Sequence, residues 1–324
     1  MKVLVVGGAG YIGSHMVLRL LEQQHEVIVL DDLSSGHADA VPPGLLVPGS
    51  IADNALLDSL FARRKPDAVM HFASFIQVGE SVEQPAKYYR NNFVNTLNLL
   101  DAMVRHEVKR FVFSSTAAIF AESDLPIAED HPKQPINPYG RSKWMVEQVL
   151  EDYGRAYGLE SCCLRYFNAA GADPAGRTGE RHDPESHLIP LLLQVASGRR
   201  ASIRVYGRDY PTPDGTCIRD YVHVLDLCSA HLLALQQLAH TKRSTAYNLG
   251  NGMGFSVQQV IDVVRTVTGR SLQIIDSERR PGDRARLVAD STRARIELGW
   301  TPSYGALEHI VLHAWNWEKK ITGL

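Results

Sequence analysis

Two side chains capable of acid–base chemistry, Tyr139 and Lys143, stand four positions apart in the segment Tyr139-Gly-Arg-Ser-Lys143. On a helix this spacing places both on one face, with their Cβ atoms roughly 5–6 Å apart. A lysine ammonium held there favours the phenolate form of the tyrosine. Lowering a tyrosine pKa from about 10 to about 7 requires about 4 kcal/mol of preferential stabilisation of the phenolate. The pair is therefore a candidate general base for an alcohol.

The residues around Tyr139 predict a helix that starts where this pair needs it. Asn137 can accept a hydrogen bond as the N-cap, and Pro138 suits the first helical position, where its missing N–H costs nothing. Tyr139 then lies in the first turn, where the helix dipole stabilises negative charge. We expect this helix to run from Pro138 to about Tyr157.

A glycine-rich segment near the N-terminus is a candidate dinucleotide-binding loop. Gly7, Gly10 and Gly13 follow the apolar run Lys2–Val6 and precede apolar residues at helical spacing. Between a strand and a helix, such glycines permit a tight turn and let a pyrophosphate approach the helix N-terminus. The glycine spacing alone is weak evidence, but here it stands in the required strand–loop–helix context. We therefore expect this loop to bind a dinucleotide.

Asp31 indicates which dinucleotide this is. It ends the second predicted strand, eighteen positions after Gly13. A carboxylate at that place accepts hydrogen bonds from the adenosine ribose hydroxyls and repels a 2′-phosphate, so it favours NAD over NADP. Beside a nicotinamide ring, a phenolate can take the hydroxyl proton of an alcohol while the ring takes the hydride from its carbon. That is the chemistry that Tyr139 and the glycine segment predict together. Lys143, the helix dipole and the oxidised ring could together lower the tyrosine pKa.

The first half of the chain alternates predicted strands and helices. This alternation predicts an α/β fold with a doubly wound parallel sheet, which binds ligands outside the carboxyl ends of its strands. We expect residues 1–168 to form the NAD-binding domain, with 224–250 returning to it, and 169–324 to form mainly a smaller, loop-rich, substrate-binding lobe. The predicted strands are Lys2–Val6, Glu26–Leu30, Ala68–His71, Arg110–Ser114 and Cys162–Phe167, and the predicted helices cover 85–106, 138–157, 187–197, 224–238 and 257–268.

Composition narrows the function classes. The chain has 324 residues, of which 44% are hydrophobic and 22% charged, and a formal net charge of −2, as in ordinary soluble globular proteins. This charge gives no electrostatic case for binding nucleic acid or an anionic membrane. No apolar run approaches about 18 residues, and a strand begins within the first seven positions, so we expect neither a membrane span nor a signal peptide. Because Cys162, Cys163, Cys217 and Cys228 lack metal-ligand spacing, we expect reduced thiols, no metal site and a cytoplasmic location.

With these motifs, the chain resembles the extended short-chain dehydrogenase/reductase family and, within it, the UDP-glucose 4-epimerases. The likeness runs from Met1 to about Trp317, which is nearly the whole chain. Its most specific part is the segment Tyr210–His223, which contains Tyr-Pro-Thr, Asp-Gly-Thr and Arg-Asp-Tyr in order. The other segments that carry the resemblance are His71–Ala73, Gly79–Ser81, Tyr88–Asn92, Ser114–Thr116, Arg165–Gly171, His187–Pro190 and Arg279–Asp283.

The resemblance implies a Rossmann-type NAD domain, with the cofactor tightly bound, and a smaller lobe that binds a nucleotide sugar. It also implies a homodimer, because relatives usually associate through the helix before Arg110 and the helix of Tyr139. The implied cofactor-binding positions are Gly7, Gly10, Tyr11, Ile12, Gly13, Asp31, Ser50, Ile51, Phe72, Ala73, Asn91, Tyr139, Lys143 and Phe167.

The activity that the resemblance implies is an isomerase of galactose metabolism, which interconverts UDP-glucose and UDP-galactose through a 4-keto sugar. Thr116 matches the family's catalytic Ser/Thr, whose hydroxyl hydrogen-bonds the sugar O4. Arg219 and Arg280 would hold the pyrophosphate, since an arginine fork matches phosphate oxygens, and Asp283 would reach the uridine ribose. The implied substrate-binding positions are Thr116, Tyr139, Asn168, His187, Leu188, Arg204, Tyr206, Arg219, Arg280, Asp283 and Leu287.

Leu287 has two interpretations. It stands four positions after Asp283, where the residue in relatives borders the C2 group of the sugar. A bulky residue at that position goes with exclusion of N-acetylated sugars. The other interpretation is that Leu287 packs into the core of the lobe.

The chain departs from the family pattern at two places. Gly49-Ser50-Ile51 replaces the usual Gly-Asp-Ile, which removes a carboxylate that meets the adenine, although Ser50 can still accept a hydrogen bond. Ile119-Phe120-Ala121 replaces Val-Tyr-Gly, which removes a hydroxyl close to the substrate. Neither departure changes the Thr/Tyr/Lys set.

Three other functions compete with epimerisation. A nucleotide-sugar 4,6-dehydratase needs an acid and a base directly after the catalytic Thr, where this chain has Ala117 and Ala118. A nucleotide-uronate epimerase or decarboxylase of the same family stays open. A non-catalytic NAD-binding regulator is disfavoured, because Thr116, Tyr139 and Lys143 are all present.

Overall fold

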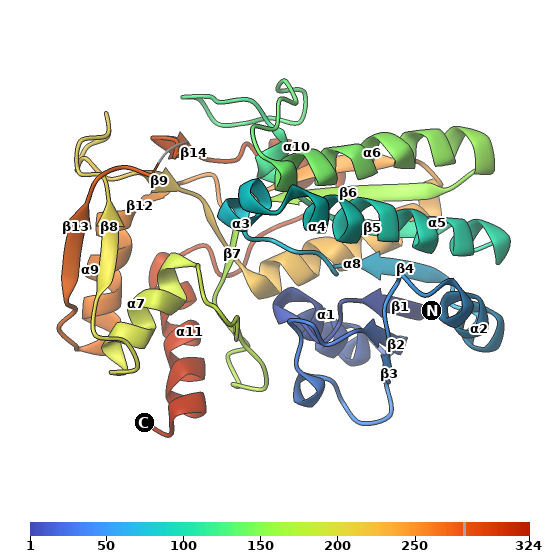
Figure 1. Ribbon diagram of the computed structural model, residues 1–324, viewed down its shortest axis with the longest axis horizontal. Coiled ribbons are helices and arrows are strands. Elements are labelled where there is room, and N and C mark those ends of the chain that lie inside the picture. Colours follow the sequence, from blue (N-terminus) through green and yellow to red (C-terminus); the bar gives the residue numbers. More distant parts are fainter. Residues whose placement is uncertain (281–282) are drawn as a thin grey trace.

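The computed structural model describes residues 1–280 and 283–324, and its larger part is a seven-stranded sheet (Figure 1). The strand order is β11-β6-β5-β4-β1-β2-β3, and all neighbours are parallel. The chain winds outward from β1 in both directions, so the carboxyl ends of β1 and β4 border the crevice where such folds bind ligands. The strands are β1 Lys2–Val6, β2 Glu26–Asp31, β3 Leu46–Pro48, β4 Ala68–His71, β5 Arg110–Thr116, β6 Glu160–Tyr166 and β11 Thr245–Leu249.

Helices cover both faces of this sheet because successive side chains of a strand point to opposite faces. Val3 and Val5 of β1 pack with α1 and α8, whereas Leu4 and Val6 pack in the layer of α2, α5 and α6. A strand buried on both faces is a continuous apolar run, as the sequence showed for β1. These helices and turns are α1 Tyr11–Glu22, η1 Ala38–Ala40, α2 Asn54–Arg64, α3 Val78–Glu83, α4 Pro85–Tyr88, η2 Tyr89–Val94, α5 Asn95–Arg105, η3 Ala117–Ile119, α6 Pro138–Tyr157 and α8 Val224–Thr241.

The smaller lobe has a core of its own, at the left of Figure 1. Ile189 of α7, Val260 of α9 and Ile310 of α11 are buried together in it. Short sheets complete the lobe: β8 pairs with β13, β9 lies between β12 and β14, and β10 pairs with β7. The remaining elements are β7 Asn168–Ala170, α7 Leu188–Ala196, β8 Ile203–Tyr206, β9 Ile218–Arg219, β10 Tyr221–His223, β12 Phe255–Ser256, α9 Val257–Thr268, β13 Ile274–Ser277, β14 Arg286–Leu287, α10 Thr292–Glu297 and α11 Leu307–Thr322.

The predicted fold class is confirmed, and one predicted helix differs in detail. Of the predicted range 85–106, residues 85–105 form α4, the π-helical stretch η2 and α5 instead of one α-helix. Asn92 in η2 is buried, and its side chain bonds the backbone N–H and C=O of Phe75 at 2.9 and 3.0 Å. The π-helical turn brings this amide to the loop after β4, which a regular helix pattern does not reveal.

Among the helices described within 1–280 and 283–324, none is both long and apolar enough to cross a membrane.

α6 begins and ends where the sequence predicts. The Asn137 side chain accepts a hydrogen bond from the Gly140 N–H at 2.8 Å, and Pro138 occupies the first turn. Gly158 ends the helix with a φ of 69°, a left-handed conformation that glycine adopts readily. A Cβ on Gly140 would overlap the carbonyl oxygen of Ala118, so glycine lets the start of α6 lie against the segment that follows β5.

A buried ion pair holds α6 against the sheet. Glu147 on α6 and Arg165 on β6 are only 4% and 6% exposed. Arg165 donates from Nε to both carboxylate oxygens, at 3.0 and 3.1 Å, and from Nη2 to Oε2 at 2.5 Å. The Ser115 hydroxyl on β5 donates to Oε1 of the same carboxylate at 2.5 Å. One carboxylate therefore ties α6 to two strands.

We expect Glu147→Ala to lower the free energy of unfolding by about 3–5 kcal/mol, because it leaves the Arg165 charge buried without its partner. Urea unfolding followed by circular dichroism measures this. The double variant Glu147→Met with Arg165→Met should recover much of the loss, since no charge then remains buried. An unchanged urea midpoint for Glu147→Ala would mean that the ion pair does not hold α6.

Candidate active site

The glycine segment forms a tight turn between β1 and α1, at the carboxyl edge of the sheet. Gly7 has a φ of 81°, and a Cβ on it would overlap the backbone of Ala73. A Cβ on Gly13 would overlap the carbonyl oxygen of Gly7. A Cβ on Gly10 would meet only that oxygen, at 3.4 Å. Packing therefore requires glycine at positions 7 and 13, whereas Gly10 leaves free the space from which a ligand approaches the helix.

The N-terminus of α1 is suited to an anion. Gly10 is its N-cap, so no side chain caps the first N–H groups of the helix. These donors and the helix dipole favour a pyrophosphate. The hydroxyl of Tyr11, the first residue of α1, donates to the Gly171 carbonyl at 2.6 Å and thereby ties the loop to the end of β7.

Asp31 lies at the end of β2 and is 8% exposed. Its Oδ2 accepts the Ala9 N–H at 2.8 Å, and its Oδ1 accepts the Leu33 N–H at 2.9 Å. Burial raises its pKa, and these two hydrogen bonds oppose that rise. Each carboxylate oxygen has a second lone pair for a ribose hydroxyl. Asp31, the glycine turn and the uncapped helix thus form a site that fits NAD.

The other predicted cofactor positions lie along the same edge of the sheet. Phe72 and Ala73 follow β4, and both donate their backbone N–H to the Val6 carbonyl, at 2.8 and 3.2 Å. The remaining predicted positions are Ile12 in α1, Ser50 and Ile51 after β3, Asn91 in η2 and Phe167 after β6. Since parallel strands end at one edge, the structure brings the residues after β1 to β6 to one side of the domain.

Thr116 and Tyr139 meet where β5 ends and α6 begins. Thr116 is the last residue of β5 and is 7% exposed, and its hydroxyl oxygen accepts the Ala118 N–H at 3.1 Å. Burial raises the pKa of Tyr139, and a hydrogen bond with the Thr116 side chain opposes that rise. The two hydroxyl groups therefore lie together, as joint action on one substrate oxygen requires.

Lys143 lies on the buried face of the same helix. Its Nζ donates to the Ser114 carbonyl at 2.9 Å and lies 4.9 Å from the centre of the Phe113 ring. Burial lowers its pKa to about 7, and the negative charge of Glu147 partly opposes this. The ammonium can therefore gain or lose its proton near neutral pH.

The predicted lowering of the Tyr139 pKa depends on Lys143, the helix dipole and an oxidised nicotinamide acting together, and it stays a prediction. In the chain itself that pKa lies above the usual value of 10, because burial outweighs the hydrogen bond with Thr116. The same burial lowers the pKa of Lys143, so both side chains favour their neutral forms. The spacing of the two residues is as predicted, and the phenolate needs positive charge beyond that of Lys143, such as an oxidised nicotinamide supplies.

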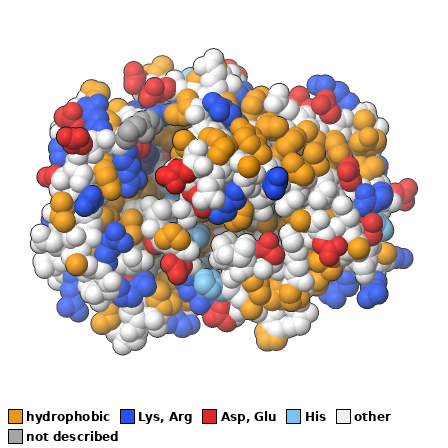
Figure 2. Space-filling model, viewed as in Figure 1, with side chains coloured by type: hydrophobic (Ala, Val, Ile, Leu, Met, Phe, Trp, Pro, Cys, Tyr) orange, Lys and Arg blue, Asp and Glu red, His pale blue; other side chains and the backbone are white. Residues whose placement is uncertain are grey.

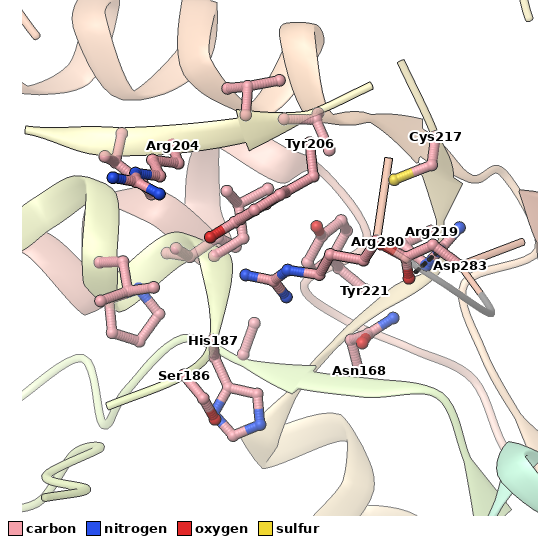
Figure 3. A pocket seen from close by; sticks show the side chains of 18 of the residues that line it. Asn168, Ser186, His187, Arg204, Tyr206, Cys217, Arg219, Tyr221, Arg280 and Asp283 are labelled. Carbon is pink, nitrogen blue, oxygen red and sulfur yellow. Dashed lines mark hydrogen bonds and ion pairs between the residues drawn. The ribbon is translucent and has the colours of Figure 1, made fainter. Parts of the chain in front are cut away.

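A cavity of about 210 Å³ lies in the smaller lobe, beside α7, β8 and β9 (Figure 3). Arg280 extends into the middle of its lining, below Tyr206 and above His187 in this view. Most of the predicted substrate-binding positions come together here, although they are spread over more than 100 residues of sequence. Those that line the cavity are Asn168, His187, Leu188, Arg204, Tyr206, Arg219, Arg280 and Asp283.

Arginines give this cavity a positive wall. The Arg280 guanidinium lies 3.8 Å from the centre of the Tyr206 ring, a stacked arrangement that leaves its N–H edges for an anion. Arg219 donates to the Ile218 and Arg284 carbonyls, at 2.9 and 2.7 Å, and pairs with Asp283 at 3.3 Å. Figure 2 shows this face hollowed between the two parts of the molecule, with basic side chains along the hollow.

Some predicted positions lie elsewhere. Thr116 and Tyr139 lie at the end of β5 and the start of α6, and neither is among the described residues that line the cavity. Leu287 does not line it either, but packs against a small apolar cluster of Ile119, Phe120 and Ile127, which is separate from the core of the smaller lobe. Within the segment 279–283, Pro281 and Gly282 lie outside the described residues.

The cavity also includes residues that the sequence reasoning did not assign to it, among them Ser186, Cys217 and Tyr221. Tyr221 is 6% exposed and packs in the core of the lobe as well. Tyr221 stands two positions after Arg219 in the Arg-Asp-Tyr sequence. In an extended segment, side chains two positions apart point to the same side, so this spacing was the signal that could have placed Tyr221 beside Arg219.

Comparison with known proteins identifies the family. Residues 3–250 match the NAD dependent epimerase/dehydratase family. The chain is 53% identical, over 99% of its length and 96% of the relative's, to a UDP-glucose 4-epimerase of Halalkalibacterium halodurans. Two similar crystal structures are UDP-glucose 4-epimerases: one from Brucella ovis with NAD (48% identity, TM-score 0.95, 97% of both chains) and one from Bifidobacterium longum with NAD+ and UDP (37%, 0.93, 100% of both). The predicted resemblance is confirmed: the chain belongs to the NAD dependent epimerase/dehydratase family and, within it, to the UDP-glucose 4-epimerases.

Proposed function

We propose that this chain interconverts UDP-glucose and UDP-galactose by oxidising and re-reducing the sugar at C4. The observation that carries this proposal is the combination of two sites. Thr116, Tyr139 and Lys143 lie where β5 ends and α6 begins, at the edge of the sheet that also carries the glycine loop. There an alcohol can lose the proton of its hydroxyl to a base and the hydride of its carbon to a dinucleotide. Arg219 and Arg280 line a neighbouring cavity that suits a diphosphate. The relative that was crystallised with NAD+ and UDP supports the same pair of ligands.

Tyr139 is the proposed general base, which takes the proton of the sugar O4 and later returns it. The Thr116 hydroxyl, next to it, holds O4 by a hydrogen bond. Lys143, on the same face of α6, stabilises the phenolate once its ammonium is formed. When bound, NAD supplies the hydride acceptor for C4 and further positive charge near the phenol.

The cavity residues hold the nucleotide while the keto sugar turns. Arg280 is stacked on Tyr206, and Arg219 is fixed by two backbone carbonyls, so both present their charge to a diphosphate in a preset position. Asp283, paired with Arg219, can accept a hydrogen bond from the uridine ribose. Asn168 donates to the Asp220 carbonyl at 2.9 Å, which leaves its side-chain oxygen for the sugar. Firm contacts thus concentrate on the nucleotide, and the sugar keeps its freedom.

We also propose a division of labour between the two parts of the chain. Residues 1–168 with 224–250 bind NAD, and residues 169–324 mainly bind the nucleotide sugar. The position of β11 supports this division, because this strand of the segment 224–250 completes one edge of the large sheet.

A homodimer through α5 and α6 and a cytoplasmic location are part of the same proposal. Figure 2 shows hydrophobic side chains gathered over the region of α3 to α6, where Val78, Val82 and Val94 are 46%, 63% and 46% exposed. An apolar patch of this kind favours association. Free, buried Cys162, Cys163, Cys217 and Cys228 fit a reducing compartment.

The experiment is to incubate the purified protein with UDP-galactose, without added NAD, and to identify the product. Formation of UDP-glucose would support both the reaction and tightly bound NAD. UDP-glucuronate should be tested in parallel, because Arg204 in the cavity is a cation that can pair with a sugar carboxylate. No conversion of UDP-galactose, even with NAD added, would contradict the proposal.

We expect Tyr139→Phe to lower kcat by about 10²–10⁴-fold, because it removes the general base and keeps the ring. NAD should remain bound, as the absorbance ratio at 260 and 280 nm of the purified variant will show. Thr116→Val is the matched control and should be milder, since it deletes one hydrogen bond and leaves the base. Near-normal turnover of Tyr139→Phe would remove Tyr139 from the mechanism.

We expect Lys143→Ala to move the rising limb of the kcat/KM pH profile to higher pH and to weaken NAD binding. Loss of the ammonium raises the Tyr139 pKa further, so the phenolate forms only at higher pH. The exposed Lys109→Ala should leave the profile unchanged. If the pH profile of Lys143→Ala coincided with that of the native enzyme, Lys143 would not control the Tyr139 pKa.

We expect strong preference of the native enzyme for UDP-glucose over UDP-N-acetylglucosamine, and relief of that preference in Leu287→Ser. The smaller side chain gives room near the apolar cluster of Ile119, Phe120 and Ile127, and a change of this size alters discrimination by about 10–200-fold. Leu287→Met keeps the volume and is the control. Equal native rates with both sugars would show that Leu287 does not act as a gate.

A further inference from the structure

Four potential metal ligands lie together in the connection between β7 and α7. They are Glu180, His182, Glu185 and His187, all within eight positions of the chain. One ligand atom from each side chain can be chosen so that all four atoms lie within 4.8 Å of one another. Of these four residues, only His187 is among the predicted substrate-binding positions, and it lines the cavity.

The two Nδ1 atoms point at the two carboxylates. His187 Nδ1 lies 2.7 Å from a carboxylate oxygen of Glu180 and 3.2 Å from one of Glu185. His182 Nδ1 lies 3.0 and 3.7 Å from the same two carboxylates. Adjacent ligands of a tetrahedral zinc ion with bonds of about 2.0–2.2 Å are about 3.3–3.6 Å apart. The four ligand atoms lie within 4.8 Å of one another, so zinc binding requires the separations between them to change by about 1 Å.

The carboxylates need positive charge at this place. The Glu180 and Glu185 side chains are only 6% and 4% exposed. Within the described part of the chain, the ion pairs of both carboxylates are with the two histidines, and none is with Lys or Arg. Two negative charges that lie this close together and away from water are costly unless positive charge neutralises them.

We propose that Glu180, His182, Glu185 and His187 bind one zinc ion. Two imidazole nitrogens and two carboxylate oxygens are a donor set that zinc accepts, and two carboxylates balance its charge. Because the protein fills all four positions, the ion is structural and takes no part in the chemistry at Tyr139.

The proposed ion lies between the two functional sites. The ring of His182 packs edge-on against Tyr11 of the glycine loop, with ring centres 6.2 Å apart. His187 lines the cavity, where Figure 3 shows it below Arg280. The Glu180 carbonyl accepts a hydrogen bond from Trp317 Nε1 of α11 at 3.0 Å. Zinc would thus fix a long irregular connection that touches both the cofactor loop and the substrate cavity.

The competing explanation is a metal-free cluster in which both histidines are protonated. Burial alone would lower the pKa of His187, but the carboxylates of Glu180 and Glu185 outweigh it and raise that pKa to about 10. His182 behaves in the same way, with a pKa raised to about 9. Two imidazolium ions would balance the two carboxylates just as zinc does, so metal content distinguishes the explanations.

A double variant separates them more sharply than single ones. Glu180→Gln with His182→Gln removes one negative and one positive charge, so a metal-free cluster stays balanced, whereas a zinc site loses two ligands. The exposed His240→Gln, on α8, is the matched control. The chain should carry no affinity tag, because histidine tags bind zinc themselves.

The measurements are zinc content by elemental analysis, after reconstitution with zinc and dialysis, and Tm with and without a chelator. We expect about one zinc ion per chain in the native protein and in His240→Gln, and a Tm that falls by about 5 °C on chelation. The double variant should bind no zinc and show the same Tm with and without chelator. A native protein that keeps no zinc, or a double variant that binds zinc as the native chain does, would overturn the proposal, whatever other metals bind.

Discussion

The buried ion pair between Glu147 and Arg165 holds α6 against the sheet, and the position of the proposed catalytic side chains depends on it. Tyr139, Lys143 and Glu147 follow one another at four-residue intervals, so one face of α6 carries the proposed base, its cation and its anchor. Shifting the helix would leave a buried charge without a partner. The same carboxylate also opposes the fall in the pKa of Lys143, so the anchor acts on the chemistry as well.

Burial around α6 sets the charge states that the reaction starts from. It raises the pKa of Tyr139 and lowers that of Lys143 to about 7, so neither side chain is strongly charged in the chain alone. The phenolate becomes favourable only when positive charge and hydrogen-bond donors gather around it. We therefore infer that binding of cofactor and substrate would activate the proposed base and limit proton abstraction to the assembled site.

Local signals made much of the site predictable. Asn137 and Pro138 predicted the start of α6, which the structure confirms, and the glycine loop with Asp31 predicted the edge of the sheet proposed to bind the cofactor. What the sequence did not reveal depends on distant contacts. In the sequence, nothing distinguishes Glu147 from the other charged residues of α6, because its partner Arg165 lies on a distant strand. Likewise, the spacing of Tyr139 and Lys143 does not show that Tyr139 is buried, and burial is what raises its pKa. The short strands β8 and β13 pair across about 70 residues, so the cavity between the lobe elements was not visible either.

If a general base and a hydride acceptor act together at C4, the fate of the hydrogen bound to C4 is fixed. Hydrogen at C4 must leave the sugar and return to it without exchanging with water, because the hydride stays in the closed site. The direct measurement uses UDP-glucose deuterated at C4 in ordinary water, with the UDP-galactose product analysed by mass spectrometry and NMR. The account predicts that deuterium is retained at C4 of the product. Loss of the label to solvent would contradict a mechanism of hydride transfer at C4 and would require a different chemistry for this site.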